Sequence, residues 1–421
     1  MAASDVVITG IGVVSPIGIG REPFWSGLCA GRSGIGRIGS FDPSWLPVQI
    51  AGEVRDFDPK LHIANRKALK VMCRDAQLGV AAAGLAYRDA GLSAGAVDPE
   101  RFGIVLGADR ICTSMEDSES TYRGCMVNQH FDFSRWGTAG MAGTFPLSFL
   151  KVLPNMIGSH ISIVLDARGP NNTIHQAEVS GLLAVDEAAR VIQRGSADVM
   201  LAGGASSQLN PYDCIRHCVM GILSRRRDDP AAAVRPFEAQ RDGQVWGEGA
   251  AVMILESRRH AEARSATVLA RLLGSAVTYQ CRGSNHMEGT GLRQAMRLAL
   301  RRAELDAGRV GHLNAHGLST ICDDRLEAQA IHDVAPAVPV TALKSYFGNL
   351  GAAGSAVQMA ASVLSFGAAL IPPTLNYEQP DPSCPLEIVR GGPARASAAT
   401  ALLVSWTPIG QAAAIVLAGP D

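Results

Sequence analysis

The chain has 421 residues, 47% of them hydrophobic and only 18% charged, so we expect a large buried core and exclude intrinsic disorder. Its formal net charge of −1 offers no overall field for nucleic acid or for an acidic membrane surface. Nine cysteines without CxxC pairs indicate reduced thiols in a cytoplasmic protein, and no apolar run reaches the roughly 18 residues of a membrane span.

Short β-branched strands alternate with alanine-rich helices along the chain. The predicted strands are "VVITGIG" from Val6, "FGIVLGA" from Phe102, "DVMLAGGAS" from Asp198, "AAVMILES" from Ala250, "GHLNAHG" from Gly311, "PVTAL" from Pro339 and "AAAIVLA" from Ala412. The predicted helices are Asp75–Ala90, Leu182–Gln193, Leu292–Ala303 and Ala356–Ser365. Continuous apolar strands between helices predict an α/β fold with sheets covered on both faces, and no internal repeat is visible.

One segment has the shape that usually presents a reactive side chain. "GPNNTIHQAEVSGLLAVDEAARVI", from Gly169, predicts the end of an extended run, a tight turn and a helix. The residue at that turn is Glu178, and none of the cysteines lies there. The carboxylate could be a catalyst, a structural plug or the remnant of a lost nucleophile. His175 could pair with it or could pack elsewhere.

Five further stretches share one resemblance. They are "VVITGIGVVSPIG" from Val6, "RPFEAQRDGQVWGEGAAVMILE" from Arg235, "LNAHGLST" from Leu313, "LKSYFGNLGAAGSAVQ" from Leu343 and "IPPTLNYE" from Ile371. Together they resemble the β-ketoacyl-ACP synthases of type II fatty acid and polyketide synthesis. The resemblance runs nearly end to end. It implies a thiolase-like αβαβα sandwich of two similar halves, which we place at residues 1–255 and 256–421, in an obligate dimer.

In that family a cysteine at a helix N-terminus takes the acyl chain as a thioester, because the free N–H groups lower the pKa of its thiol. Two histidines hold the malonyl thioester and stabilise the enolate that forms as carbon dioxide leaves. The matching positions here are Glu178 for the cysteine, His316 and Asn349 for the two histidines, Lys344 for the lysine, and Asp324 and Glu327 for the acids of a supporting ion network. We expect Lys344 to form an ion pair with one of those acids, which would hold loops together.

Two more positions depart from the family pattern. A glycine-rich gate loop is replaced by "SWTPIGQ", Ser405 to Gln411, so we expect impaired gate motion. The residues in place of the mobile ones are Trp406, Thr407, Pro408 and Ile409. Arg110 occupies a position that is small or aliphatic in the acyl pocket of the family.

These departures argue against condensation. An acyl–glutamate would be an anhydride, prone to hydrolysis, and with Asn349 in place of a histidine two of the three central groups are gone. The resemblance then favours a chain-length-factor subunit, paired as a heterodimer with an active ketosynthase and served by an acyl carrier protein. Such subunits usually carry glutamine at the elbow, from which Glu178 departs. The segment Gln129–Gly158 would supply dimer contacts, unless it is plain core.

Two alternatives remain open. The first is a malonyl-ACP decarboxylase or an acyltransferase that uses His316 and Asn349; an anionic Glu178 opposes it by about 4 kcal/mol at 4 Å from a malonyl carboxylate, and burial would weaken that objection. The second is a homodimeric pseudo-enzyme that only binds acyl-ACP. No metal or phosphate motif is present, so we expect neither a metal nor a cofactor. Arg225 to Arg227 could receive an acidic carrier protein, but the acids that follow favour a solvated loop.

Overall fold

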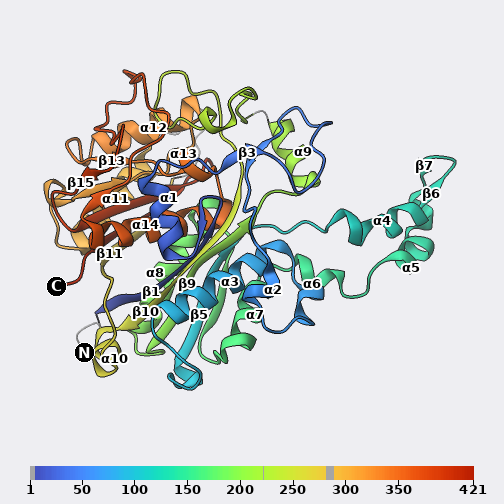
Figure 1. Ribbon diagram of the computed structural model, residues 1–421, viewed down its shortest axis with the longest axis horizontal. Helices are drawn as coiled ribbons and strands as arrows, with labels where there is room; N and C mark the ends of the chain where they lie inside the picture. Colours follow the sequence, from blue (N-terminus) through green and yellow to red (C-terminus); the bar gives the residue numbers. More distant parts are fainter. Residues whose placement is uncertain (1–4, 221, 281–288) are drawn as a thin grey trace.

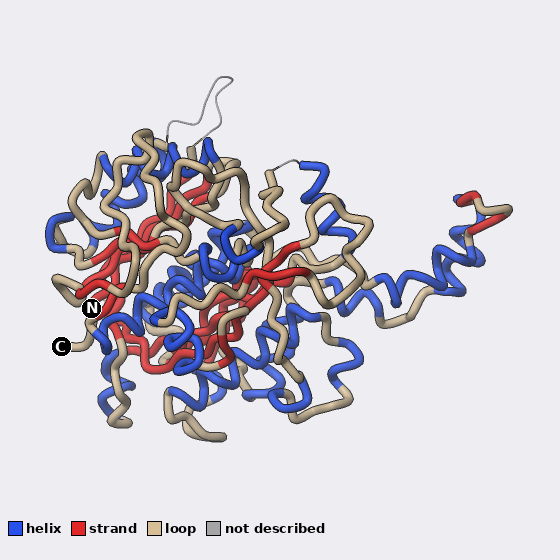
Figure 2. The backbone as a smooth tube through the Cα atoms, turned by 45° about the horizontal axis from the view of Figure 1, so that its top comes forward, coloured by secondary structure: helices blue, strands red, loops and turns tan. Residues whose placement is uncertain are grey.

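The computed structural model describes residues 5–220, 222–280 and 289–421. In this part of the chain an 11-stranded mixed sheet follows the order β13-β12-β16-β17-β11-β1-β10-β9-β5-β8, with β2 paired to β1 (Figures 1 and 2). The first five strands of this order, taken along the chain, are β1 (Val6–Ser15), β5 (Phe102–Ala108), β8 (Asn171–Ile174), β9 (Val199–Ser207) and β10 (Glu248–Ser257). The second five are β11 (Ala270–Tyr279), β12 (His312–Asn314), β13 (Val340–Thr341), β16 (Thr400–Trp406) and β17 (Gln411–Ala418).

The two sets of strands repeat one topology. In the first set β5 lies parallel to β8 and β9, and β10 is antiparallel to β9 and β1. In the second set β12 lies parallel to β13 and β16, and β17 is antiparallel to β16 and β11. The sets join where β1 pairs with β11, Val6 opposite Leu272. The expected two similar halves are confirmed, and the division at 255/256 stays a proposal.

Three layers of helices enclose the strands. The inner layer is α8 (Ser180–Gln193) and α14 (Gly354–Ala368), which pack on each other and on strands of both halves. The outer layers are α3 (Arg74–Asp89) with α7 (Met156–Leu165) on one half and α11 (Thr290–Arg302) with α12 (Ile321–His332) on the other. This is the expected αβαβα sandwich. The inner helices approach closely because Gly181 has no side chain; a Cβ there would lie 2.8 Å from the Ser355 hydroxyl.

The predicted helices and strands all form, with helix ends shifted by a few residues, whereas β11 and β16 were not predicted. The remaining elements are α1 (Arg21–Cys29), α2 (Pro59–His62), α4 (Met115–Gly124), α5 (Met141–Gly143), α6 (Ser148–Val152), α9 (Pro211–Met220), α10 (Arg258–Ala263), α13 (Lys344–Phe347), β2 (Gly18–Ile19), β3 (Ile35–Arg37), β4 (Ile50–Gly52), β6 (Met126–Val127), β7 (His130–Phe131), β14 (Leu370–Ile371) and β15 (Ala394–Arg395). Within the described ranges no helix is both long and apolar enough to cross a bilayer.

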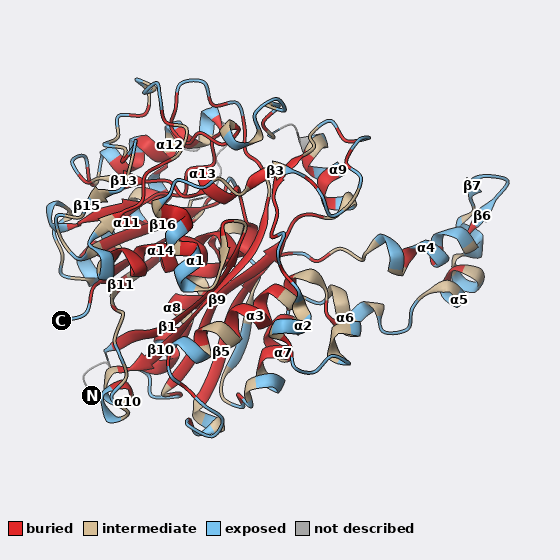
Figure 3. Cartoon of the chain, in the orientation of Figure 1, coloured by how far each residue is buried: buried red, intermediate tan, exposed pale blue. Residues whose placement is uncertain are grey.

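A long arm, residues 114–153, projects from the body and carries α4, β6, β7 and α5 near its tip (Figures 1 and 3). Its two legs are joined by an ion pair between Lys151 and Asp117 at 2.7 Å. Large apolar side chains remain exposed along it, with Phe133 at 75% and Phe149 at 55%. The plain-core reading of Gln129–Gly158 is therefore wrong for most of that segment, because a core needs a covering layer that this chain does not supply.

Candidate active site

The turn between β8 and α8 is built as a rigid elbow. Ala177 has a left-handed backbone with φ of 49°, which a non-glycine residue adopts only under local constraint. The Ser180 hydroxyl supplies that constraint: it accepts the Gln176 N–H at 2.8 Å and donates to the Ala177 carbonyl at 2.7 Å. The strand β5 passes so close that a Cβ on Gly107 would lie 2.8 Å from the Ser180 Cβ. The elbow thus holds Glu178 at a sharp corner, as the sequence predicted.

The carboxylate of Glu178 lies among neutral donors. Asn349 Nδ2 donates to its Oε1 at 3.2 Å, and no cation in the described chain lies within 4 Å of it. Burial raises the pKa of Glu178, and nearby Asp109 raises it further, while its own backbone N–H, Asn349 and Lys344 oppose the shift. His175 is exposed and forms no hydrogen bond with Glu178 among the described contacts.

His316 follows β12 and is fully buried. Lys344 donates to its Nδ1 at 3.1 Å and to its carbonyl oxygen at 2.6 Å. Glu327 accepts the backbone N–H groups of His316 and Gly317 at 2.7 and 2.8 Å. Burial and the neighbouring ammonium hold the pKa of His316 well below its usual value, so the imidazole is neutral at neutral pH.

Lys344 does not form the ion pair that we expected. Within the described residues no carboxylate lies within 4 Å of its ammonium, because Glu327 and Asp324 are both occupied by backbone N–H groups. Burial lowers the pKa of Lys344 to about 8, although the charges of Glu327, Glu178 and Asp324 oppose the shift. Burial also raises the pKa of Glu327. Lys344 therefore orients His316 and interacts with the acids only at longer range.

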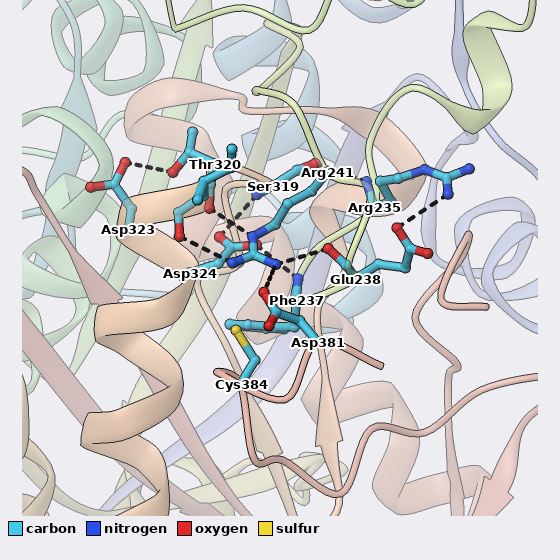
Figure 4. Close-up of polar contacts among 12 residues, drawn as sticks. Arg235, Phe237, Glu238, Arg241, Ser319, Thr320, Asp323, Asp324, Asp381 and Cys384 are labelled. Atoms are coloured by element: carbon cyan, nitrogen blue, oxygen red, sulfur yellow. Dashed lines mark hydrogen bonds and ion pairs between the residues drawn. The ribbon is translucent and has the colours of Figure 1, made fainter. Parts of the chain in front are cut away.

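Asp324 holds two loop segments together by accepting backbone N–H groups from each of them (Figure 4). It accepts the N–H of Ser319 at 3.0 Å and that of Phe237 at 2.8 Å, and Arg241 lies 3.6 Å away. Arg241 also bonds Asp381 at 2.6 Å. Burial raises the pKa of Asp324 to about 7. The role of this acid is to tie residues 235–241 to the second half.

Asn349, at the position of the second histidine, has no free donor. Its Nδ2 bonds Glu178 and, at 2.8 Å, the Oε1 of Gln244, and its Oδ1 accepts the Gly351 N–H at 3.1 Å. The backbone N–H of Asn349 bonds the Val245 carbonyl at 2.7 Å. The amide joins the two halves of the site, and Gln244 is a partner that sequence reasoning missed.

A second acid, Asp109, was also missed. It directly follows β5 and accepts the Ala352 N–H at 2.7 Å, the Ser206 hydroxyl at 2.8 Å and the Gln208 amide at 3.2 Å. It is buried, and burial raises the pKa of its carboxyl. The available signal was an acidic residue directly after a buried strand, at the carboxyl edge where ligands of parallel sheets bind. Its neighbour Arg110 turns away to pair with the buried Asp213.

The gate segment is a tight hairpin. Trp406 is the last residue of β16, is 3% exposed, and its ring centroid lies 6.1 Å from that of His316. Thr407, Pro408 and Ile409 form the turn, which the Gly410 N–H closes by bonding the Thr407 carbonyl at 2.9 Å. One strand residue earlier, Ser405 donates to the carbonyl oxygen of Glu178 at 3.0 Å. Hairpin hydrogen bonds and a buried indole oppose any swing of this segment.

The site as a whole brings together Glu178, His316, Asn349 and Lys344, with Asp324 and Glu327 behind them. No cysteine lies at the elbow, and no group of three or more potential metal ligands occurs among the described residues. The arrangement contains a carboxyl group, a neutral imidazole and a buried ammonium, and it lacks a thiol nucleophile at the elbow.

Comparison with known proteins identifies the family of the chain. Residues 3–261 match the N-terminal domain of the beta-ketoacyl synthases and residues 269–378 match the C-terminal domain. The "Putative polyketide beta-ketoacyl synthase 1" of Streptomyces halstedii is 37% identical over 99% of this chain and 98% of its own, and the "3-oxoacyl-[acyl-carrier-protein] synthase 2" of Coxiella burnetii is 35% identical over 92% of each.

Two solved structures share the whole fold. The ishigamide ketosynthase/chain length factor has a TM-score of 0.89 at 29% identity, covering 100% of both chains. A type II PKS ketosynthase, solved in complex with its acyl-carrier protein and bound to the hexaketide, has a TM-score of 0.84 at 28% identity and covers 99% of this chain and 100% of its own. With both halves matched and the fold shared from end to end, this chain belongs to the β-ketoacyl synthase family.

Proposed function

We propose that this chain is a non-condensing subunit of type II polyketide or fatty acid synthesis, which pairs with an active β-ketoacyl synthase in the role of a chain length factor. The observation that carries the proposal is the carboxylate at the elbow. A thiolate there accepts an acyl group as a stable thioester, whereas Glu178 would form an anhydride that water destroys. Carbon–carbon bond formation then belongs to the partner subunit.

The arm supports a partner role. Exposed phenylalanine and methionine side chains of residues 114–153 cost free energy in water, at roughly 25 cal/mol for each Å² of apolar surface, unless another chain covers them. Two of the similar solved structures are a ketosynthase/chain length factor and a ketosynthase with its carrier protein. By that likeness we assign the arm to an active ketosynthase partner, and we expect an acyl carrier protein to deliver substrate to the pair.

The decarboxylase and acyltransferase alternatives each require two groups, His316 and Asn349, and the second is already engaged in other hydrogen bonds. Both need Asn349 to hold a thioester oxygen, but its amide is already committed to Glu178 and Gln244. A second copy of this chain would cover the arm equally well, so an experiment must distinguish the homodimeric pseudo-enzyme from the heterodimer.

The experiment is co-expression of the tagged chain with an active type II ketosynthase and its carrier protein. We expect a heterodimer that elongates malonyl units, while this chain purified alone does not. The double variant Phe133→Ser/Phe149→Ser should lose the partner, because both side chains lie exposed on the arm. Tyr279→Ser, similarly exposed but distant on β11, is the matched control and should retain it. Elongation by the pure single chain, or a homodimer that excludes the ketosynthase, would refute the assignment.

A further inference from the structure

One hydrogen-bond donor in the elbow site is uncommitted. Lys344 Nζ lies 3.1 Å from His316 Nδ1, and an ammonium can only donate, so Nδ1 is the acceptor and the neutral ring carries its hydrogen on Nε2. Nε2 is buried and has no partner among the described residues. A buried N–H without an acceptor loses its hydrogen bond to water and gains none in the protein, which costs free energy. An oxygen atom of a bound ligand would supply the missing acceptor.

The second group of the elbow site is the carboxylate of Glu178. Glu178 has no cation within 4 Å in the described chain, and its side-chain partner there is Asn349, which donates to Oε1 at 3.2 Å and leaves the second oxygen available. Ser405 links the main chain at Glu178 to His316, because its hydroxyl donates to the Glu178 main-chain carbonyl at 3.0 Å and lies 3.3 Å from His316 Nδ1. Burial strengthens the base by raising the pKa of Glu178.

We infer that Glu178 and His316 form a proton-transfer site that enolises a neutral β-ketoacyl thioester. The C2–H bond breaks and its proton passes to the free oxygen of Glu178. The electron pair of the broken bond forms the C2=C3 double bond, and the π electrons of the C3 carbonyl move onto its oxygen. The His316 Nε2–H then donates a hydrogen bond to this enolate oxygen. Returning the proton restores the substrate, so the net reaction is exchange at C2, with no oxidant or co-reactant.

The chemistry of the two groups selects this substrate class. A carboxylate removes a proton more readily from a carbon between two carbonyls, because that C–H is far more acidic than the C–H of a simple acyl thioester. A malonyl thioester carries its own carboxylate, which an anionic Glu178 repels. A β-ketoacyl chain is neutral and avoids that repulsion. The inference is independent of the partner role, which needs no proton transfer.

The test follows deuterium uptake at C2 of 2-methyl-3-oxobutanoyl-pantetheine in D2O by mass spectrometry, with the full-length chain at matched protein concentrations. We expect uptake at least about 100-fold above the buffer rate, as general-base catalysis gives. Glu178→Gln keeps the size of the side chain and the oxygen that accepts from Asn349, but it removes the base. The exchange rate of this variant should therefore equal the buffer rate. His316→Phe removes the donor and should do the same. Glu378→Gln, an exposed acid, is the matched control and should equal the parent.

A second readout separates chemistry from folding. The exchange rate should rise with pH through an inflection above 4.5, the ordinary value for glutamate, because burial and Asp109 raise the pKa of Glu178 more than Lys344 and Asn349 lower it. Thermal melting within a few degrees of the parent shows that each variant is folded. Exchange no faster than buffer, full exchange in Glu178→Gln, or equal loss in Glu378→Gln would each overturn the inference. A failed heterodimer assay would leave it standing.

Discussion

Asp75 makes the stability of this protein depend on pH in a predictable way. It lies in the first turn of α3, is 4% exposed and accepts the Ser207 N–H at 2.8 Å, and no cation in the described chain lies within 4 Å of it. Burial raises the pKa of Asp75 to about 7, with further contributions from Asp109 and Glu248, against 3.8 for an ordinary aspartate.

The sign of the effect follows from proton binding. Between pH 4 and pH 7 the folded state keeps the Asp75 proton that the unfolded state releases, so the stability from this group is complete below pH 4 and is lost as pH rises through 7. A difference of about 3 between the folded and unfolded pKa values corresponds to about 4 kcal/mol. An asparagine side chain would not titrate in this window. Relative to the parent, Asp75→Asn should therefore gain up to about 4 kcal/mol in free energy of unfolding between pH 4 and pH 8.

The assay is urea denaturation of parent and variant at unit pH steps from 4 to 8 and constant ionic strength. The variant amide retains an oxygen for the Ser207 N–H, so the two proteins should differ little at pH 4 and diverge toward pH 8. Asp56→Asn, at an exposed site, controls for the general loss of a negative charge and should run parallel to the parent. If the Asp75→Asn curve also ran parallel to the parent, burial would not be raising this pKa.

Two further predictions concern the elbow site. Gly351→Ala should destabilise the fold by about 3 kcal/mol in denaturant titrations, because φ is 52° at Gly351 and a Cβ would lie 2.0 Å from Asp109 Oδ2. The control is Gly392→Ala, which has open space around it and should change the free energy of unfolding by less than about 0.5 kcal/mol. An equal effect at both glycines would contradict the argument. Glu178→Cys should not condense acyl and malonyl thioesters by itself, because Asn349 and the hairpin at Trp406 stay unchanged. The double variant Glu178→Cys/Asn349→His is the comparison, and robust condensation by the single variant would show that these other departures do not matter.

The elbow could be predicted from sequence because its determinants are local. An extended run, a turn and an alanine-rich helix follow one another within 24 residues, and the structure places Glu178 at that corner. The bond between Glu178 and Asn349 is different, since the two residues are 171 positions apart and meet only when the halves pack. Motif resemblance brought both positions to attention, but it could not show that the Asn349 amide is also committed to Gln244.

Other errors have equally physical origins. Apolar periodicity shows that a segment has an apolar face but does not show what covers it, so Gln129–Gly158 read equally as core or as interface. The duplicated topology was invisible in the residues because strand order is a property of pairing across the sheet. Lys344 was expected to form an ion pair with Asp324 or Glu327, as the resemblance to the family implied. The structure instead satisfies Glu327 with two backbone N–H groups and directs Lys344 onto His316.

A glutamate at the elbow needs an explanation beyond the loss of a thiol. A buried carboxylate costs free energy that a small apolar residue would not, and Asp109 adds to that cost. The Asn349 amide and the backbone N–H of Glu178 offset part of it, so the site is arranged around this group. A purely structural bridge between the halves would be served equally well by glutamine, which keeps the oxygen that Asn349 needs. Glutamine cannot accept a proton from a substrate, and Glu178→Gln therefore distinguishes a bridge from a base.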